Sequence, residues 1–354
     1  MWVIDLRCAG RDWPFGYGAL VAEVEWPGAE WMTAESPVPV GSLLDRAFDD
    51  AGPLARTFAV VVVHQGRVVA ERYAGALEHF DRPPDPVGRD TPLLSWSMAK
   101  SVLHAVVGLL VGDGRLSLDA PADVPQWAGT DRAAITLQHM LEMRDGLDWV
   151  EDYVDERASD VIEMLFGSGQ DDVAAFAADR HLAAPPGDRF LYSSGTSNIV
   201  SGVVARLLGP GAGYEKFLRE RLFEPIGMTS ATPTFDAAGT WVASSYLHAT
   251  ARDFARFGYL YLRDGVWAGR RLLPEGWVRH GTTVRSVDEE GLLYGAHWWL
   301  TGDDHGSFRA AGYEGQYVLV CPSLDLVVVR LGKTPDDRSA DVRAWLAAVL
   351  AAFT

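Results

Sequence analysis

Runs of β-branched residues mark both ends of the patterned part of the chain. Residues 57–75 read TFAVVVVHQGRVVAERYAG, in which two β-rich runs flank a short polar segment. This pattern predicts a β-hairpin with Gly66 in its turn. Short β-rich runs return in residues 294–300, 315–322 and 325–332, and the segment PSLD between the last two predicts a second hairpin.

Apolar residues at helical spacing dominate the rest of the pattern. In residues 93–110, LLSWSMAKSVLHAVVGLL, apolar side chains recur near every third or fourth position, which predicts a largely buried helix. The same periodicity predicts further helices over residues 133–143, 197–208, 250–265 and 339–353.

The predicted strands lie at both ends of the chain, with a mostly helical region between them. A doubly wound parallel sheet would instead need strands and helices that alternate along the chain. This order predicts an α+β fold, in which an antiparallel sheet built from both ends of the chain is flanked by helices and carries a mostly helical inserted region. We expect residues 1–110, including an N-terminal wrap, and 240–354 to form the sheet domain. Residues 111–239 would form the helical region, and the active site would lie between them.

The charge balance limits the partners. The 354 residues carry a formal net charge of -17, and phosphate contacts need clustered lysine and arginine, so nucleic acid and anionic membranes are poor partners. Cys8 and Cys321 form no CxxC motif and no disulfide framework. The N-terminus is too charged for a signal peptide, and no apolar run is long enough to span a bilayer. We expect a soluble, cytoplasmic protein with a small-molecule partner; its oligomeric state stays open.

A lysine in the apolar stretch is the first candidate for chemistry. Lysine is scarce in this chain, yet Lys100 lies three positions after Ser97 in the predicted helix. Positions i and i+3 share a helix face, so the two side chains are neighbours. A serine hydroxyl is a poor nucleophile until a base takes its proton. A buried lysine can do so because desolvation lowers its pKa, whereas an arginine stays protonated.

Two other segments suggest a site only in combination. Tyr192 and Ser194 lie where a Pro/Gly turn gives way to a helix, and a tyrosine near an ammonium group ionises more easily and can act as an acid or base. A tyrosine that packs in the core is the plainer alternative. Gly312 and Gly315 flank Tyr313 and Glu314 before a strand. They would let the backbone approach a ligand, or simply form a turn or bulge.

Three motifs in this order resemble the serine β-lactamase-like superfamily. They are SMAK at residues 97–100, YSS at 192–194 and GYEGQ at 312–316. The resemblance covers about residues 55–350 and lies in the branch with class C β-lactamases, esterases and D-aminopeptidases. The segment GLDWVEDYVDERASDV, residues 146–161, is similar to 6-aminohexanoate-dimer (nylon-oligomer) hydrolases. The implied fold is the β-lactamase/transpeptidase-like one.

The resemblance implies a role for each motif residue. Ser97 would attack the acyl carbonyl, Lys100 would accept its proton, and Tyr192 would relay a proton to the leaving group and later activate water. Backbone N–H groups of Ser97 and Gln316 would form the oxyanion hole. The resemblance also implies a set of substrate-binding residues, namely Tyr153, Ser194, Tyr313, Glu314 and Gly315.

Two departures from the family pattern bear on the substrate. Tyr313-Glu314-Gly315 stands where β-lactamases have Lys-Thr-Gly, which argues against antibiotic hydrolysis. Met164 falls where linear-dimer hydrolases have an acid that binds the substrate amine. Ester hydrolysis needs neither feature. Four acids of the 148–160 loop could favour a cationic substrate, although a solvated loop face is the better interpretation; they are Glu151, Asp152, Asp155 and Glu156.

The sequence therefore predicts a serine hydrolase that cleaves a small carboxylic ester or short amide through an acyl-enzyme on Ser97. We expect no cofactor and no metal, because the chain has no HExxH, Walker A or GxGxxG motif and its histidines lack metal-ligand spacing. A β-lactamase or D-amino-acid peptidase is the first alternative. A catalytically silent binding domain of the same fold is the second.

Overall fold

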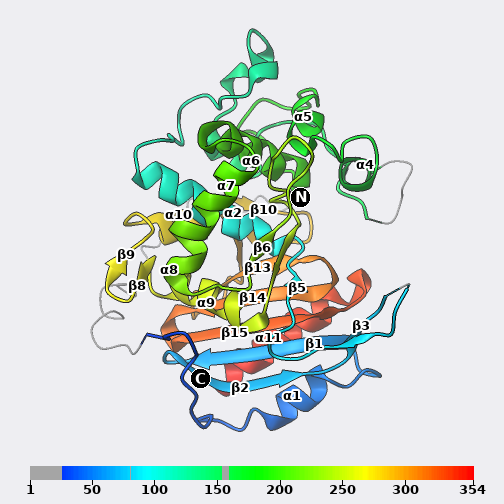
Figure 1. Ribbon diagram of the computed structural model, residues 1–354, viewed down its shortest axis with the longest axis vertical. Helices are drawn as coiled ribbons and strands as arrows, with labels where there is room; N and C mark the ends of the chain where they lie inside the picture. The colour runs from blue at the N-terminus through cyan, green and yellow to red at the C-terminus, as the bar shows by residue number, and fades with distance from the viewer. Residues whose placement is uncertain (1–25, 80, 154–158) are drawn as a thin grey trace.

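The computed structural model describes residues 26–79, 81–153 and 159–354 (Figure 1). In this part of the chain an antiparallel eight-stranded sheet has the order β10-β11-β12-β13-β14-β15-β1-β2. Its strands are β1 Arg56–His64, β2 Arg67–Tyr73, β10 Ser286–Val287, β11 Leu293–Tyr294, β12 Trp299–Leu300, β13 Phe308–Gly312, β14 Gln316–Cys321 and β15 Leu326–Lys333.

Strands from the two ends of the chain pair with each other near the β2 edge of this sheet. β1 pairs with β15 along its whole length, for example Val61 with Val329. Both predicted hairpins are confirmed: Gly66 turns β1 into β2 with φ 78°, and Asp325, with φ 47°, precedes β15. The predicted α+β class, with an antiparallel sheet assembled from both ends of the chain, is confirmed. The domain boundaries after residues 110 and 239 stay a prediction.

One prediction in this region was wrong in detail. Residues 294–300 do not form one strand but two short ones, β11 and β12, with His297 between them at φ 56°. The backbone of the intervening residues is bonded elsewhere: the N–H of Ala296 donates to Gly281 and that of His297 donates to Leu141. These contacts satisfy groups that a continuous strand would have used in the sheet.

Helices cover both faces of the sheet (Figure 1). The alternation of side chains along β1 sends Val61 and Val63 to one core, shared with α2 and α9, and Val60 and Val62 to another, shared with α1 and α11. These helices are α1 Gly41–Ala47, α2 Met98–Gly112, α9 Ala251–Leu262 and α11 Ser339–Ala352. The strongly apolar α2 is buried because it lies between the sheet and the helical part of the chain.

The remaining elements surround this framework. The helices are α3 Leu137–Leu141, α4 Asp160–Phe166, α5 Val173–Ala178, α6 Ser194–Leu208, α7 Ala212–Leu218, α8 Glu224–Ile226 and α10 Trp277–Thr282. The minor strands are β3 Ala76–Leu77, β4 Asp85–Pro86, β5 Leu93–Leu94, β6 Thr232–Pro233, β7 Leu247–Ala249, β8 Val266–Trp267 and β9 Arg270–Arg271. The predicted helix over 133–143 is shortened to α3, because Thr136 caps its N-terminus in a capping box with His139. Among the described helices, none is both long and apolar enough to cross a membrane.

A buried arginine fastens the end of the sheet. Arg330 of β15 is fully buried and donates hydrogen bonds to several acceptors, which are the carbonyls of Leu54, Arg56, Glu314 and Gly315 and the hydroxyls of Thr57 and Thr334. Burial lowers the pKa of its guanidinium to about 10. The side chain thus ties the turn between β13 and β14 to the segment that precedes β1.

Replacing Arg330 with methionine should destabilise the fold. Arg330→Met keeps an unbranched apolar stem but leaves several buried carbonyls without donors, so we expect a loss of about 3 kcal/mol or more in the free energy of unfolding. Urea denaturation measures the change, and Arg270→Met on an exposed strand is the matched control. A loss no larger than that of the control would show that the buried hydrogen bonds of Arg330 are dispensable.

Candidate active site

Ser97 lies at the start of α2 with its hydroxyl available. It occupies the N-cap position, yet its side chain makes no capping hydrogen bond. Trp96 before it has φ 45°, in the left-handed region, and this tight turn leads the chain from β5 into the helix. The Ser97 side chain borders an open cleft of about 680 Å³. The serine is thus held at the positive end of a helix and faces the space where a substrate would bind.

Lys100 lies one turn further along α2, and its ammonium group joins three segments. Nζ donates to Ser97 Oγ at 2.9 Å, to Ser194 Oγ at 3.0 Å and to the carbonyl of Ser244 at 3.0 Å. The residue is 2% exposed. Burial lowers the pKa of Lys100 to about 8, although the charge of Glu151 opposes this shift. A lysine with such a pKa has an appreciable unprotonated fraction near neutral pH and can accept the serine proton.

Tyr192 completes the group around the nucleophile. It precedes α6, its ring centroid lies 4.8 Å from Lys100 Nζ, and it lines the same cleft as Ser97, whose side chain acts to lower its pKa. Burial raises the pKa of Tyr192, and the charge of Glu151 raises it further. The expectation that the nearby ammonium group makes this tyrosine ionise more easily was wrong, because burial and the charge of Glu151 both act in the opposite direction. Tyr192 is a protonated phenol that can donate or relay a proton.

Glu151 is a central residue of the site that the sequence analysis misjudged. Its carboxylate accepts hydrogen bonds from the Ser194 hydroxyl at 2.5 Å, the Ser194 N–H at 2.8 Å, Trp149 Nε1 at 2.6 Å and the Tyr153 hydroxyl at 3.1 Å. The interpretation as a solvated loop face is therefore wrong for Glu151. The alternation Trp149, Glu151, Tyr153 was the available signal, since it places three side chains on one face of an extended segment. Asp155 and Glu156 lie outside the described residues.

Aromatic rings form one wall of the cleft. Tyr153 stacks on Tyr313 with centroids 4.8 Å apart and an interplanar angle of 17°. Trp96 meets Tyr313 edge-on at 5.6 Å, and its Nε1 donates to Glu314 Oε2 at 3.4 Å. The Tyr153 hydroxyl also lies 3.5 Å from Ser194 Oγ. The substrate-binding candidates from the 153 and 313–315 segments are thus brought together.

The start of β14 lies close to the nucleophile. A Cβ on Gly312 would come 2.3 Å from the carbonyl oxygen of Ser95, so only glycine permits this approach. Gln316 begins β14, and its side chain exchanges hydrogen bonds with the backbone of Gly332 at 2.6 and 3.0 Å. These contacts hold the start of β14 beside the segment that leads into Ser97. The two predicted oxyanion-hole positions, Ser97 and Gln316, therefore lie on adjoining segments.

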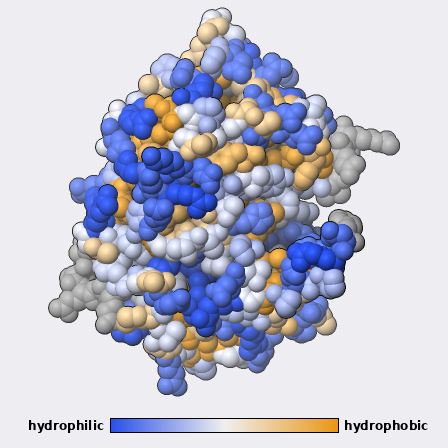
Figure 2. Space-filling view, viewed as in Figure 1, coloured by the Kyte–Doolittle hydropathy of each residue, from blue (hydrophilic) through white to orange (hydrophobic). Residues whose placement is uncertain are grey.

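The cleft itself brings most of the candidates to one surface. Its lining includes Ser97, Glu151, Tyr153, Tyr192, Tyr313, Glu314 and Gly315 from the predicted segments, together with Trp299 and Arg309. Lys100 and Ser194 are buried behind this lining. Figure 2 shows hydrophilic patches interspersed with apolar ones over one face of the molecule, with a hollow at its right margin.

Several contributors could not be found from the sequence. The Ser244 carbonyl carries no sequence signal because any residue has one. Trp299 lies 5.6 Å from the Tyr192 ring and reaches the site only through sheet pairing. Met164 is fully buried against Asn198, so it does not stand at the cleft surface where an amine-binding acid would act. Among the described residues, no cluster of His, Cys, Asp and Glu side chains is arranged to hold a metal ion.

Comparisons with known proteins agree with this geometry. Residues 46–352 match the family model described as Beta-lactamase. The 6-aminohexanoate-dimer hydrolase of Paenarthrobacter ureafaciens is 30% identical over 334 residues, which is 88% of this chain and 81% of the relative. The esterase EstB of Burkholderia gladioli is 27% identical over 271 residues, covering 72% and 64%.

Solved structures show the same fold. A Bacillus anthracis protein provisionally assigned as a 6-aminohexanoate-dimer hydrolase superposes with a TM-score of 0.73 at 23% identity, covering 91% of this chain and 87% of that one. The β-lactamase/transpeptidase-like fold that the resemblance implied is therefore confirmed. The family match spans both the sheet and the helical segments that meet at Ser97, and with the 30% identical relative it shows that the chain belongs to the β-lactamase family and is a serine hydrolase.

Proposed function

We propose that the protein hydrolyses small carboxylic esters or short amides through an acyl-enzyme on Ser97. The observation that supports this most directly is the 2.9 Å contact between Lys100 Nζ and Ser97 Oγ in a buried setting. A lysine that was merely structural would gain from a carboxylate partner, but this ammonium group is bonded to two hydroxyls and a carbonyl.

In the proposed reaction, neutral Lys100 takes the Ser97 proton as Oγ bonds to the acyl carbon. The backbone N–H groups of Ser97 and Gln316 would donate to the oxygen that becomes negative. Tyr192 would pass a proton to the leaving group, whose bond to carbon breaks. Lys100 then returns its proton to Tyr192. In the second half, water attacks the acyl carbon and gives a proton to Tyr192, which passes its own to Lys100. The bond between the acyl carbon and Ser97 Oγ breaks, Oγ regains a proton from Lys100, and the acid product leaves.

The surroundings of Ser97 favour an ester over a β-lactam. Tyr313 stands where the family lysine would hold the β-lactam carboxylate, and the negative charge of the adjacent Glu314, which also lines the cleft, would repel such a group. Glu151 is occupied by Ser194, Trp149 and Tyr153, which weakens the case for a cationic substrate at this position. The β-lactamase, D-amino-acid peptidase and silent-domain alternatives are separated by the experiments that follow.

Ser97 should be the site of covalent labelling. A fluorophosphonate is expected to add once to the wild type and not to Ser97→Ala, because only an activated serine attacks phosphorus at an appreciable rate. Intact mass spectrometry gives the count, and Ser323→Ala, at an exposed position, should label like the wild type. An adduct that persists in Ser97→Ala would refute the assignment, and failure to label the wild type would favour the silent domain.

Turnover of para-nitrophenyl esters but not of a chromogenic cephalosporin would then support the esterase.

Lys100→Arg should lower kcat by about 10²-fold or more, because an arginine keeps a positive charge but cannot act as a base. Steady-state hydrolysis of para-nitrophenyl butyrate measures the loss. Lys216→Arg is the matched control, since Lys216 is an exposed lysine that pairs with Glu220. A Lys100→Arg enzyme with near wild-type kcat would show that the lysine supplies only charge.

The pH profile should report the Lys100 pKa. The unprotonated form is the base, so kcat/KM rises with pH and reaches half its plateau near pH 8. Glu151→Gln removes the negative charge that holds this pKa up, so the midpoint should move to lower pH. Asp148→Asn, on an exposed acid of the same loop, should leave the midpoint unchanged. A midpoint that stays in place, or rises, in Glu151→Gln would contradict the assignment of Lys100 as the titrating base.

A further inference from the structure

A buried cation with no ion-pair partner among the described residues lies at the other end of the cleft. Arg309 of β13 is only 5% exposed, yet its side chain makes no hydrogen bond or ion pair within the part of the chain that the structure describes. It lines the same cleft as Ser97. Burial lowers the pKa of Arg309 and the neighbouring charge of Arg343 lowers it further, while the charges of Asp288 and Asp303 oppose this shift. A desolvated guanidinium beside a like charge is unfavourable unless an anion compensates it.

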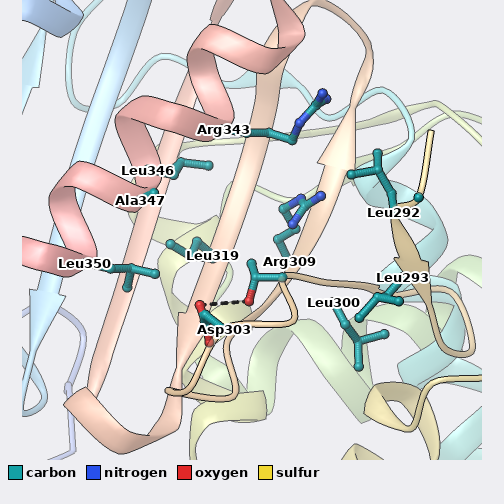
Figure 3. Close-up of a pocket in the computed structure, with 12 residues that line it drawn as sticks. Leu292, Leu293, Leu300, Asp303, Arg309, Leu319, Arg343, Leu346, Ala347 and Leu350 are labelled. Carbon is teal, nitrogen blue, oxygen red and sulfur yellow. Dashed lines mark hydrogen bonds between the residues drawn. The ribbon is translucent and has the colours of Figure 1, made fainter. Parts of the chain in front are cut away.

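Arg343 of α11 stands next to Arg309 and faces the same space. Figure 3 shows both guanidinium groups pointing into the gap between α11 and the segment that carries Leu292. Behind them lies an apolar pocket of about 260 Å³, whose lining includes Leu293, Leu300, Leu319, Leu346 and Leu350. An anion at this position would meet two forked donors against a wall that excludes water, which strengthens the attraction.

The nearest acids do not neutralise this pair. Asp288 Oδ1 accepts the backbone N–H groups of Glu290 at 3.0 Å and Leu292 at 2.7 Å, so it is committed to its own turn. The Glu290 carboxylate is 72% exposed and lies 3.7 Å from Arg343, and such surface pairs contribute little. Asp303 lines the same pocket, but its carboxylate accepts hydrogen bonds from the hydroxyls of Thr301 and Ser307. Within the described part of the chain, Asp288 and Asp303 thus offset the charge of Arg309 only from a distance, and no acid forms an ion pair with it.

The distance from the nucleophile follows from strand geometry. Gly312 touches the backbone of Ser95, next to the nucleophile, and Arg309 lies three residues back along β13. Three residues of a strand cover about 10 Å. We propose that Arg309 and Arg343 bind the carboxylate of a substrate whose scissile carbonyl lies at Ser97, on the order of 10 Å away along the cleft, so that a spacer of several methylene groups joins the two. This inference rests on the proposed ester or amide hydrolysis.

The test compares matched pairs of charged and neutral esters. The charged substrates are mono-para-nitrophenyl suberate, with the carboxylate in the acyl part, and an acetoxyoctanoate, with the carboxylate in the leaving group; each is paired with its methyl ester. The readout is the ratio of kcat/KM for the charged ester to that for its neutral partner. A general loss of folding or activity lowers both values and cancels in this ratio.

For one of the two pairs, Arg309→Gln should lower this ratio about tenfold, because it removes a charge-assisted hydrogen bond. Arg309→Lys should retain part of the preference, and Arg270→Gln, on the exposed strand β9, should leave the ratio as in the wild type. Mono-para-nitrophenyl succinate is too short to span the distance, so its ratio should not respond to Arg309→Gln. Ratios that stay unchanged in Arg309→Gln for both long esters would overturn the proposal.

A binding experiment separates this proposal from the proposed hydrolysis. Monomethyl suberate is titrated calorimetrically into Ser97→Ala and into the Ser97→Ala, Arg309→Gln double variant. Binding to the first that weakens about tenfold in the second supports the carboxylate site even if the wild type hydrolyses no ester. Equal binding to both, or no binding to either, contradicts the carboxylate site, whatever the outcome with neutral esters.

Discussion

The buried ammonium group of Lys100 is the contact on which the arrangement of the site depends. It draws together the first turn of α2, the first residue of α6 and the carbonyl of Ser244. These segments are far apart in the sequence and belong to different parts of the fold. A cation in such a place needs several acceptors at once, so its position fixes theirs. Glu151 extends the same network outward to Trp149 and Tyr153 through Ser194.

Hydrogen bonds from buried side chains hold the backbone around the site. Gln316 bonds to the backbone of Gly332 across the β14–β15 pair, and Arg330 holds the carbonyls of the 313–315 turn. Glu314 and Gly315 have positive φ values of 59° and 80°. A turn of this conformation keeps its shape only when its surroundings fix it. Catalytic geometry on strands and helix ends is better defined than geometry on free loops.

Local sequence pattern predicted the local parts of this structure. The Ser97–Lys100 contact follows from helix periodicity, and both hairpins follow from β-rich runs beside turn residues. Contacts between residues far apart in the sequence could not be predicted from local pattern. The Ser244 carbonyl has no side-chain signal, and Trp299 is placed by strand pairing alone. β13 was not expected, because its sequence FRAAG has no β-branched residue and is a strand only through its partners β12 and β14. The pKa direction of Tyr192 was wrong because sequence shows a neighbour but not the extent of burial.

The depressed pKa of Lys100 also links protonation to the stability of the fold. In the unfolded chain this lysine would hold its proton up to its ordinary pKa of 10.5, whereas in the folded chain it releases the proton near pH 8. The folded state therefore bears a penalty at all pH values below about 8, of about 3 kcal/mol. The penalty disappears as the pH rises from about 8 to the ordinary lysine value. With respect to this one group, the protein becomes more resistant to unfolding in mildly alkaline solution, under the same conditions in which its proposed base is free to act.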